Sequence, residues 1–333
     1  MDPPSPADPR GGSGLLPISS SMAHRPLPLL LALVAASVWP APTVRAQAGA
    51  NVDIRLAFTF SDAPGPDGKL LPGKEQTTRV LEALKTGHVT EAAFYINPAS
   101  LAQPGGMERV QAYAAAGHRL GLYVPVAPSA GAEFIAAFKT GHELVSKLPN
   151  FFASVRYPEP KDPKQDVIPA EVQSALTTAG YTIGYYTASA SDARMNQLLQ
   201  QAVEEKKPIK YDYVRDVYLR LHVESLQFYE QMAGVVSNNR SGSHILLLHE
   251  NDLSARYLLG LIVQCRRMGG ETITITQALK DPVAQMMPKQ SAQSRLVGLA
   301  LDRQGSRALT PERATDEGMD KMFEFFNAFT GKK

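Results

Sequence analysis

The sequence predicts an α/β fold built around a parallel β-sheet. Patterns typical of strands and of helices alternate from residue 54 to about residue 275. Seven segments are short and β-rich, and nearly all are separated by a helical segment, which indicates repeated βαβ units. The composition, 44% hydrophobic and 20% charged over 333 residues, is that of an ordinary globular protein. Seven strands fit either a barrel or a doubly wound sheet, and periodicity alone does not choose between them.

The first four expected strands are short apolar runs, which lie at residues 54–60, 92–96, 120–124 and 151–155. The helices between them are expected at residues 74–87, 107–116 and 130–148. The first helix carries Val80, Leu81 and Leu84 on one face, as an amphipathic helix does. Gly117 follows the second, and glycine commonly ends a helix.

The later strands are expected at residues 182–187, 245–248 and 271–275, and the later helices at residues 170–179, 193–205, 211–233 and 253–268. The longest of these helices has apolar residues spaced i, i+3, i+4 and i+7, so one stripe is buried: Val214, Val217, Tyr218 and Leu221. Gly180 ends the helix before the fifth strand, and Gly269 ends the helix before the seventh.

The two ends of the chain differ from this alternating region. Residues 1–21 are rich in Pro, Gly and Ser, which predicts a disordered extension, and residues 22–48 have the pattern of a signal peptide. Cleavage is expected after Ala48 or after Ala46, and an uncleaved membrane anchor is the alternative. The domain itself then covers residues 49–283. Residues 284–333 form a C-terminal extension, either packed on the domain through a helix at 319–329 or partly disordered.

Charge and cysteine content exclude several classes of site. The net charge of +2 predicts no nucleic-acid partner, and Cys265, the one cysteine, leaves no possibility of an intrachain disulfide or a cysteine metal site. The sequence contains no P-loop, no G-x-G-x-x-G and no G-x-S-x-G motif. No two histidines have the i, i+4 spacing of a helical zinc site.

Polar residues follow several of the expected strands, where ligands bind in parallel α/β folds. They come from separate parts of the chain: Ser61, Asp62, Tyr123, Arg156, Tyr157, Asp192 and His249. A histidine, two aspartates and an arginine at one mouth can carry general acid–base chemistry. Arg–Asp pairs that only hold loops together are the alternative.

Five short motifs, in order, resemble those of the polysaccharide deacetylase family, also called the NodB-homology family. AFTFSDAP at 57–64 is similar to the family's T-F-D-D-G-P, and GHRLG at 117–121 to G-H-E-[IL]-G. RYP at 156–158 is similar to R-x-P, Gly180-Tyr181 with Asp192 to the fourth region, and LLLH at 246–249 to L-L-H. The resemblance covers about residues 52–283 and implies an α/β fold of a particular kind, a distorted (β/α)7-type barrel.

The resemblance assigns roles to residues and also shows departures. It implies catalytic roles for His249 as general acid, Asp192 as the residue that tunes it, and Arg156, which in the family orients the base. The family's base is replaced by Ser61, and its two metal-binding histidines fall on Tyr123 and Ala127. Asp62 matches the metal-binding aspartate and is expected as a residual metal ligand. One carboxylate is not a zinc site, which needs about three protein ligands.

Three functions follow from this pattern. The first is an exported family member, periplasmic or secreted, that acts on or binds acetylated envelope carbohydrate with impaired metal-dependent deacetylation. Ser61, Tyr123 and Tyr157 would then contact the glycan, and no cofactor is expected. The second is an active hydrolase that removes N-acetyl groups with zinc or another divalent metal held by rearranged ligands. The third is a non-enzymatic scaffold. No stable membrane span is expected after signal cleavage, and the oligomeric state stays open.

Overall fold

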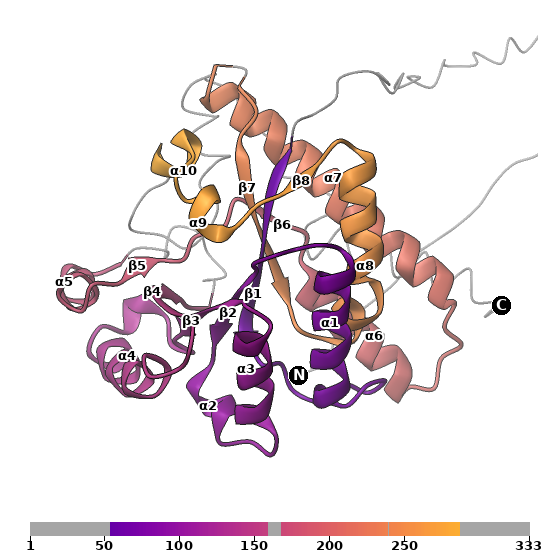
Figure 1. The fold of residues 1–333 in the computed structure, drawn as a ribbon. Helices are drawn as coiled ribbons and strands as arrows, with labels where there is room; N and C mark the ends of the chain where they lie inside the picture. Colours follow the sequence, from indigo (N-terminus) through magenta and orange to yellow (C-terminus); the bar gives the residue numbers. More distant parts are fainter. Residues whose placement is uncertain (1–53, 159–167, 239, 287–333) are drawn as a thin grey trace, which may run out of the picture. The chain divides into compact units, whose positions relative to one another are not determined.

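Parallel β-strands alternate with helices through the part of the chain that the computed structural model describes, residues 54–158, 168–238 and 240–286 (Figure 1). The strands are β1 (Arg55–Ala63), β2 (Ala93–Ile96), β3 (Arg119–Tyr123), β4 (Phe151–Arg156), β5 (Thr182–Ile183), β6 (Ala188–Ser189), β7 (Ser243–His249) and β8 (Glu271–Thr272). The predicted N-terminal extension and signal peptide, and the helix expected at 319–329, lie outside the described residues.

The helices connect the strands and cover the sheet. They are α1 (Gly73–Thr86), α2 (Pro98–Leu101), α3 (Gly106–Ala115), the 3-10 turn η1 (Pro128–Ala130), α4 (Ala132–Val145), α5 (Ala170–Thr178), α6 (Asp192–Glu204), α7 (Tyr211–Val236), α8 (Asp252–Arg267), α9 (Ile275–Ala278) and α10 (Pro282–Met286). No helix in the described ranges is long and apolar enough to span a bilayer.

The strands form one sheet in the order β5-β4-β3-β2-β1-β7-β6, with β8 paired to the start of β1. Every pairing is parallel. The predicted α/β fold with a curled, barrel-like parallel sheet is confirmed. The first strand, β1, lies inside this order, between β2 and β7.

The chain between β4 and β7 connects the two ends of the strand order. A single strand over 182–187 was the expectation, but the structure has two short strands, β5 against β4 and β6 against β7. The prediction of one strand was wrong because residues 184–187 belong to neither strand; they connect β5, which pairs with β4, to β6, which pairs with β7. The segment Gly184–Thr187 therefore spans from one end of the ordered sheet to the other.

The end of the domain also differs from the expectation. The strand predicted at 271–275 stops at Thr272, because Thr274 caps helix α9, which begins at Ile275. Its hydroxyl accepts a hydrogen bond from the backbone N–H of Gln277, and the Gln277 side chain accepts one from the backbone N–H of Thr274. This reciprocal pair of hydrogen bonds is a capping box, which stabilises the start of a helix.

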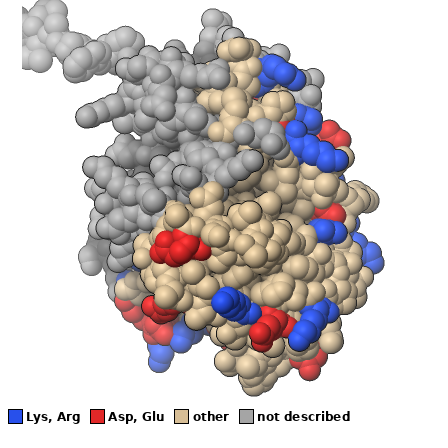
Figure 2. Space-filling view, turned by 90° about the vertical axis from the view of Figure 1, so that its left-hand side faces the viewer, with Lys and Arg blue, Asp and Glu red and all other residues tan. Residues whose placement is uncertain are grey.

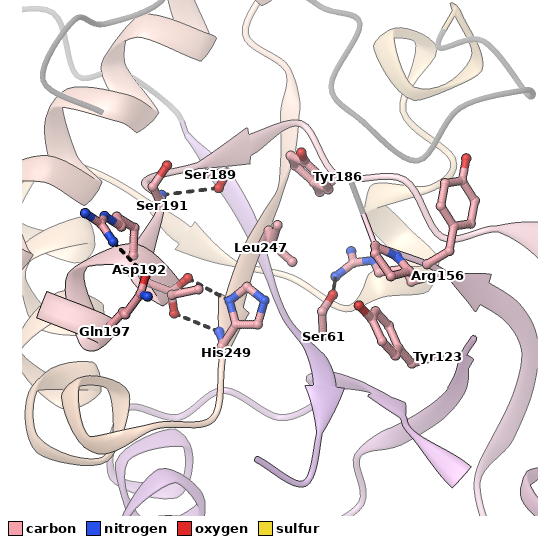
Figure 3. Close-up of a pocket in the computed structure, with 14 residues that line it drawn as sticks. Ser61, Tyr123, Arg156, Tyr186, Ser189, Ser191, Asp192, Gln197, Leu247 and His249 are labelled. Carbon is pink, nitrogen blue, oxygen red and sulfur yellow. Dashed lines mark hydrogen bonds and ion pairs between the residues drawn. The ribbon is translucent and has the colours of Figure 1, made fainter. Parts of the chain in front are cut away.

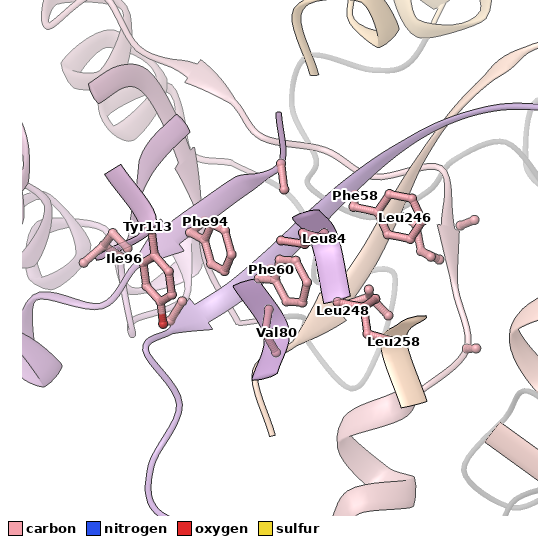
Figure 4. Close-up of a cluster of buried hydrophobic side chains, with 14 of the residues drawn as sticks. Phe58, Phe60, Val80, Leu84, Phe94, Ile96, Tyr113, Leu246, Leu248 and Leu258 are labelled. Atoms are coloured by element: carbon pink, nitrogen blue, oxygen red, sulfur yellow. The ribbon is translucent and has the colours of Figure 1, made fainter. Parts of the chain in front are cut away.

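One face of the sheet packs against helices and holds the main core. Phe58 and Phe60 on β1 and Leu246 and Leu248 on β7 point to this side and meet helices α1 and α8 (Figure 4). The Phe60 ring stacks on Phe94 of β2 at 4.7 Å. Because neighbouring residues of a strand point to opposite faces, Thr59, Ser61 and their equivalents on β7 face the interior of the curled sheet.

Tyr95 of β2 fills the interior of the curled sheet below its mouth. It is 1% exposed, and its hydroxyl lies 3.1 Å from the Ser154 hydroxyl. A Cβ on Gly121 would lie 2.8 Å from the Tyr95 ring, and one on Gly184 would lie 2.3 Å from its hydroxyl. Glycine at these two positions leaves the space that the tyrosine occupies.

His118 is buried at the start of β3, where its Nδ1 accepts a hydrogen bond from the backbone N–H of Ala92 at 3.2 Å. Burial lowers the pKa of His118 to about 4. Unfolding exposes the ring, whose pKa returns to about 6.5, so the unfolded chain binds more protons between these values.

We expect the free energy of unfolding to fall by about 3 kcal/mol through His118 as the pH drops from about 6.5 to about 4. Urea unfolding of the wild type and of His118→Gln at pH 7 and at pH 5 would measure this contribution. The variant should lose less stability between the two pH values than the wild type. An equal loss in both proteins would show that His118 is protonated in the folded state.

Acidic and basic side chains are interspersed over one face of the described residues. Figure 2 shows blue and red side chains scattered around a central area without charge. Because positive and negative side chains are mixed, this face does not carry a strong electrostatic potential of one sign.

Candidate functional site

A cavity of about 570 Å³ opens at the carboxyl ends of the strands (Figure 3). This is the side at which parallel α/β folds bind ligands, because the strand-to-helix loops meet there. Ser61 comes from β1, Tyr123 from β3, Arg156 from β4 and His249 from β7, while Asp192 is the first residue of α6. The structure thus brings together five residues that the sequence placed at separate strand ends.

His249 and Asp192 form a hydrogen-bonded pair on one side of this cavity. The His249 Nδ1 lies 2.9 Å from the Asp192 Oδ1, and the backbone N–H of His249 donates to the Asp192 Oδ2 at 2.8 Å. Both carboxylate oxygens are therefore engaged by one residue, which holds the imidazole in a single orientation. The side chain of Asp192 is 1% exposed and that of His249 is 30% exposed.

The Asp192 carboxylate stays ionised in spite of its burial. Burial alone would raise the pKa of Asp192, but the charge and the hydrogen bonds of His249 hold this pKa below its ordinary value. His222 of α7 is a second histidine near this carboxylate. Burial lowers the pKa of His222, so its ring is neutral at pH 7. Asp192 therefore acts as a fixed hydrogen-bond acceptor for His249.

Arg156 lies across the cavity from Asp192 and is 2% exposed. Its Nη1 donates to the Ser61 hydroxyl at 3.0 Å, and its Nε donates to the carbonyl oxygen of Gly184 at 2.5 Å. The guanidinium carbon lies 4.1 Å from the centre of the Tyr95 ring, which is a cation–π contact. These contacts place a permanent positive charge next to the Ser61 oxygen.

Three tyrosines line the same cavity, Tyr123, Tyr157 and Tyr186. Tyr157 is 4% exposed and packs edge to face on Phe134 at 6.1 Å, so it also belongs to the core. Tyr123 is more accessible, at the end of β3. Aromatic side chains beside a few fixed polar groups are typical of small-molecule and sugar sites.

Asp62 is the predicted site residue that the structure does not place among those lining the cavity. It is exposed, its backbone has a left-handed φ of 53°, and its Oδ1 accepts a hydrogen bond from the Asn97 Nδ2 at 2.7 Å. The pairing of β1 with β2 is irregular between Phe60 and Ala63, so the regular alternation of the strand is interrupted at Asp62.

The residues at this mouth do not fit a zinc ion. No group of three or more His, Cys, Asp or Glu side chains is placed to hold a metal within the described ranges. Tyr123 occupies the end of β3, Asp62 bonds to Asn97, and Asp192 bonds to His249. Zinc sites use about three nitrogen, sulfur or carboxylate ligands around one point.

Sequence reasoning missed Tyr95, Arg194 and Gln197, which belong to the site or support it. Tyr95 lies under Arg156, in the middle of a strand that reads only as apolar. Gln197 lines the cavity from the first turns of α6, one helical turn after Ala193. Nothing in the sequence marks a residue in the middle of an apolar strand as part of a site. Gln197, by contrast, comes four residues after Ala193, so helical spacing places the two on the same face of α6 and could have identified Gln197.

A buried ion pair fixes the corner that follows His249. The side chain of Glu250 is 0% exposed and accepts hydrogen bonds from the hydroxyls of Thr77 on α1 and Tyr113 on α3. The Arg109 Nη2 lies 3.3 Å from the Glu250 Oε1, and the Arg109 Nε donates to the Thr77 hydroxyl at 2.8 Å. Burial, and then Glu250, raise the pKa of Tyr113 well above its usual range, so Tyr113 remains a donor.

Asp252 fixes the loop between β1 and α1 from the same corner. It is 0% exposed, and its carboxylate accepts from the backbone N–H groups of Leu70 and Leu71 at 3.0 Å each. The side-chain amides of Gln76 and Gln200 donate to it as well. The loop that follows β1 is thereby tied to the first residue of α8, three residues after His249.

Comparisons with known proteins found similarity in solved structures alone. No family model and no curated protein matches the sequence. A variant of the peptidoglycan deacetylase PdaC from Bacillus subtilis aligns with a TM-score of 0.43 and 15% identity over 71% of this chain and 94% of that one. The chitin deacetylase from Colletotrichum lindemuthianum aligns at 0.42 and 16% over 68% and 88%. A CE4-family pseudoenzyme from Bacillus anthracis aligns at 0.42 and 16% over 70% and 67%.

Proposed function

We propose that this chain is a polysaccharide deacetylase-family protein that binds acetylated envelope carbohydrate in the cavity at the strand ends. It is exported, and metal-dependent deacetylation is impaired. The observation that carries the proposal is the convergence of Ser61, Arg156, Asp192 and His249 on one cavity. These are the positions to which the five-motif resemblance assigns the reaction centre.

The lining of the cavity supports a sugar ligand. Tyr123 and Tyr186 offer aromatic surfaces, and Arg156, Gln197 and His249 offer hydrogen-bond groups held in place by their neighbours. Sugar rings present apolar C–H faces and polar rims, which match such a mixture. The altered metal positions support loss of the metal-bound water, because Tyr123 and Ala127 stand where the resemblance places the two metal-binding histidines and only Asp62 remains of that ligand set.

Calorimetric titration of the full chain with N-acetylated chito-oligosaccharides, and with their deacetylated counterparts, tests the proposal. We expect the acetylated ligand to bind more tightly. Tyr123→Ala should weaken its binding by about tenfold or more, which corresponds to about 1.4 kcal/mol. Tyr211→Ala is the matched control, since Tyr211 is an exposed tyrosine of α7 that does not line the cavity.

The outcomes separate the three functions. Equal affinity for both ligands, or no binding, argues against the proposal and favours a scaffold. Zinc bound in stoichiometric amounts, together with acetate release that stops when a chelator removes the zinc, would instead establish an active metal-dependent hydrolase.

A further inference from the structure

The pairing of β1 with β7 places Ser61 directly beside His249. The two residues are partners in the register of these neighbouring parallel strands, whose backbones lie about 4.8 Å apart. Both side chains line the cavity, because both lie on the interior face of the sheet. The serine that replaces the family's base thus lies next to the histidine that is hydrogen-bonded to Asp192.

Asp192 determines which nitrogen of His249 carries the proton. An ionised carboxylate only accepts hydrogen bonds, so the His249 Nδ1 at 2.9 Å from Asp192 is the donor. When the ring is neutral, its Nε2 is then the basic nitrogen. In Figure 3 the imidazole lies between Asp192 and Ser61, with its far edge toward the serine.

Arg156 completes the surroundings of the Ser61 oxygen. Its Nη1 donates to that oxygen at 3.0 Å, and the guanidinium is fixed by the Gly184 carbonyl and the Tyr95 ring. A fixed cation at this point stabilises negative charge that develops on the Ser61 oxygen. It equally stabilises negative charge on the carbonyl oxygen of a substrate whose acyl carbon is attacked by Ser61.

From these contacts we propose that Ser61, His249 and Asp192 form a metal-independent nucleophilic triad that removes O-acetyl groups from a carbohydrate. The choice of carbohydrate rests on the proposed function. The choice of an ester rests on the chemistry, since an alcohol leaves more easily than an amine when no metal polarises the carbonyl. The arrangement has a nucleophile, a base and an orienting carboxylate, as in other serine hydrolases, although the sequence has no G-x-S-x-G motif.

The reaction has two balanced steps. The Ser61 oxygen bonds to the acetyl carbon while the His249 Nε2 takes the hydroxyl proton. The ester C–O bond of the substrate then breaks, and the same proton passes to the departing sugar oxygen. Water attacks the acetyl carbon while His249 takes its proton as base, the bond between the acetyl carbon and the Ser61 oxygen breaks, and the proton on His249 passes to that oxygen. Acetate and the free sugar hydroxyl are the products, and nothing is oxidised or reduced.

The test treats the chelator-washed full chain with p-nitrophenyl acetate, follows p-nitrophenol release, and locates the acetyl group by mass spectrometry of peptides. We expect a burst of p-nitrophenol and an acetyl group on the peptide that contains Ser61. Ser61→Ala should abolish both. Asp192→Asn, which disturbs the imidazole tautomer, should slow acylation by about 100-fold or more. Ser146→Ala, at the end of α4, is the matched control and should leave both unchanged.

Several results would overturn the triad. These are the absence of acetylated Ser61 in the wild type, equal acetylation of another residue in Ser61→Ala, and a burst that needs added zinc. The titration with oligosaccharides separates this inference from the proposed function. Binding without serine acetylation would refute the triad alone, and acetylation without oligosaccharide binding would refute the carbohydrate ligand alone. Circular dichroism of Ser61→Ala should match that of the wild type, because the change removes only one hydroxyl.

Discussion

Replacing Glu250 with alanine should lower the free energy of unfolding by about 3–5 kcal/mol, because it leaves part of a buried charged network without its partner. The carboxylate is fully buried and receives hydroxyl hydrogen bonds from Thr77 and Tyr113 and the positive charge of Arg109. After the substitution, the side chain of Arg109, only 11% exposed, has lost its ion-pair partner, and Tyr113 has lost its acceptor. A lone buried charge costs far more than the pair contributes when intact.

Urea unfolding followed by circular dichroism measures this loss. Glu250→Gln is the informative comparison, because it keeps an oxygen that can accept from Tyr113 or Thr77 and removes only the negative charge. Glu75→Ala removes an exposed carboxylate that pairs with Arg79, and should change stability by less than about 1 kcal/mol. A Glu250→Ala variant that is as stable as Glu75→Ala would show that the network is dispensable.

Asp252→Ala should have the second-largest effect, about 2–4 kcal/mol, because several buried donors lose one acceptor together. The backbone N–H groups of Leu70 and Leu71 donate to this carboxylate, as does the amide of Gln76, which is 1% exposed. Each buried donor that is left without an acceptor costs about 1–3 kcal/mol before the loop relaxes.

The effect of Asp252→Ala should also be local. Hydrogen exchange should speed up at Leu70 and Leu71 more than at the backbone amides of β2 and β3. Asp252→Asn should retain part of the protection, since one carbonyl oxygen remains. Uniformly faster exchange across the sheet would contradict the assignment of Asp252 to the loop.

The parallel sheet could be predicted from the sequence because apolar strands alternate with amphipathic helices over the whole domain. What could not be predicted was the division of the fifth strand. Residues 182–187 look like one strand, but β5 and β6 lie against different partners, and only the tertiary structure determines which. The shortest strands have two residues each, and two residues are too few to show the alternation of apolar and polar side chains that identifies a strand.

The candidate site could be predicted to the level of strand ends. That rule placed Ser61, Tyr123, Arg156 and His249 near one another, because parallel strands end on the same side. The rule assigned Asp62 to the same site as well, but its left-handed backbone and the irregular pairing of β1 at this point, which the sequence does not show, leave it exposed and bonded to Asn97. The partners of Glu250 come from α1 and α3, and nothing in those helical sequences marks Thr77 or Tyr113 as buried donors.

The central place of β1 has a consequence for the order in which the protein is made. β7, its partner on one side, begins at Ser243, so the residue pairs across this seam are about 190 positions apart. At a synthesis rate of about 5–20 residues per second, β1 waits about 10–40 s for that partner. During this time the backbone N–H and C=O groups of β1 that pair with β7 in the folded protein have no strand to bond to. The neighbouring positions Ser61 and His249 therefore come together only when nearly the whole domain exists, and a chain that stops before residue 243 contains the serine but never the site.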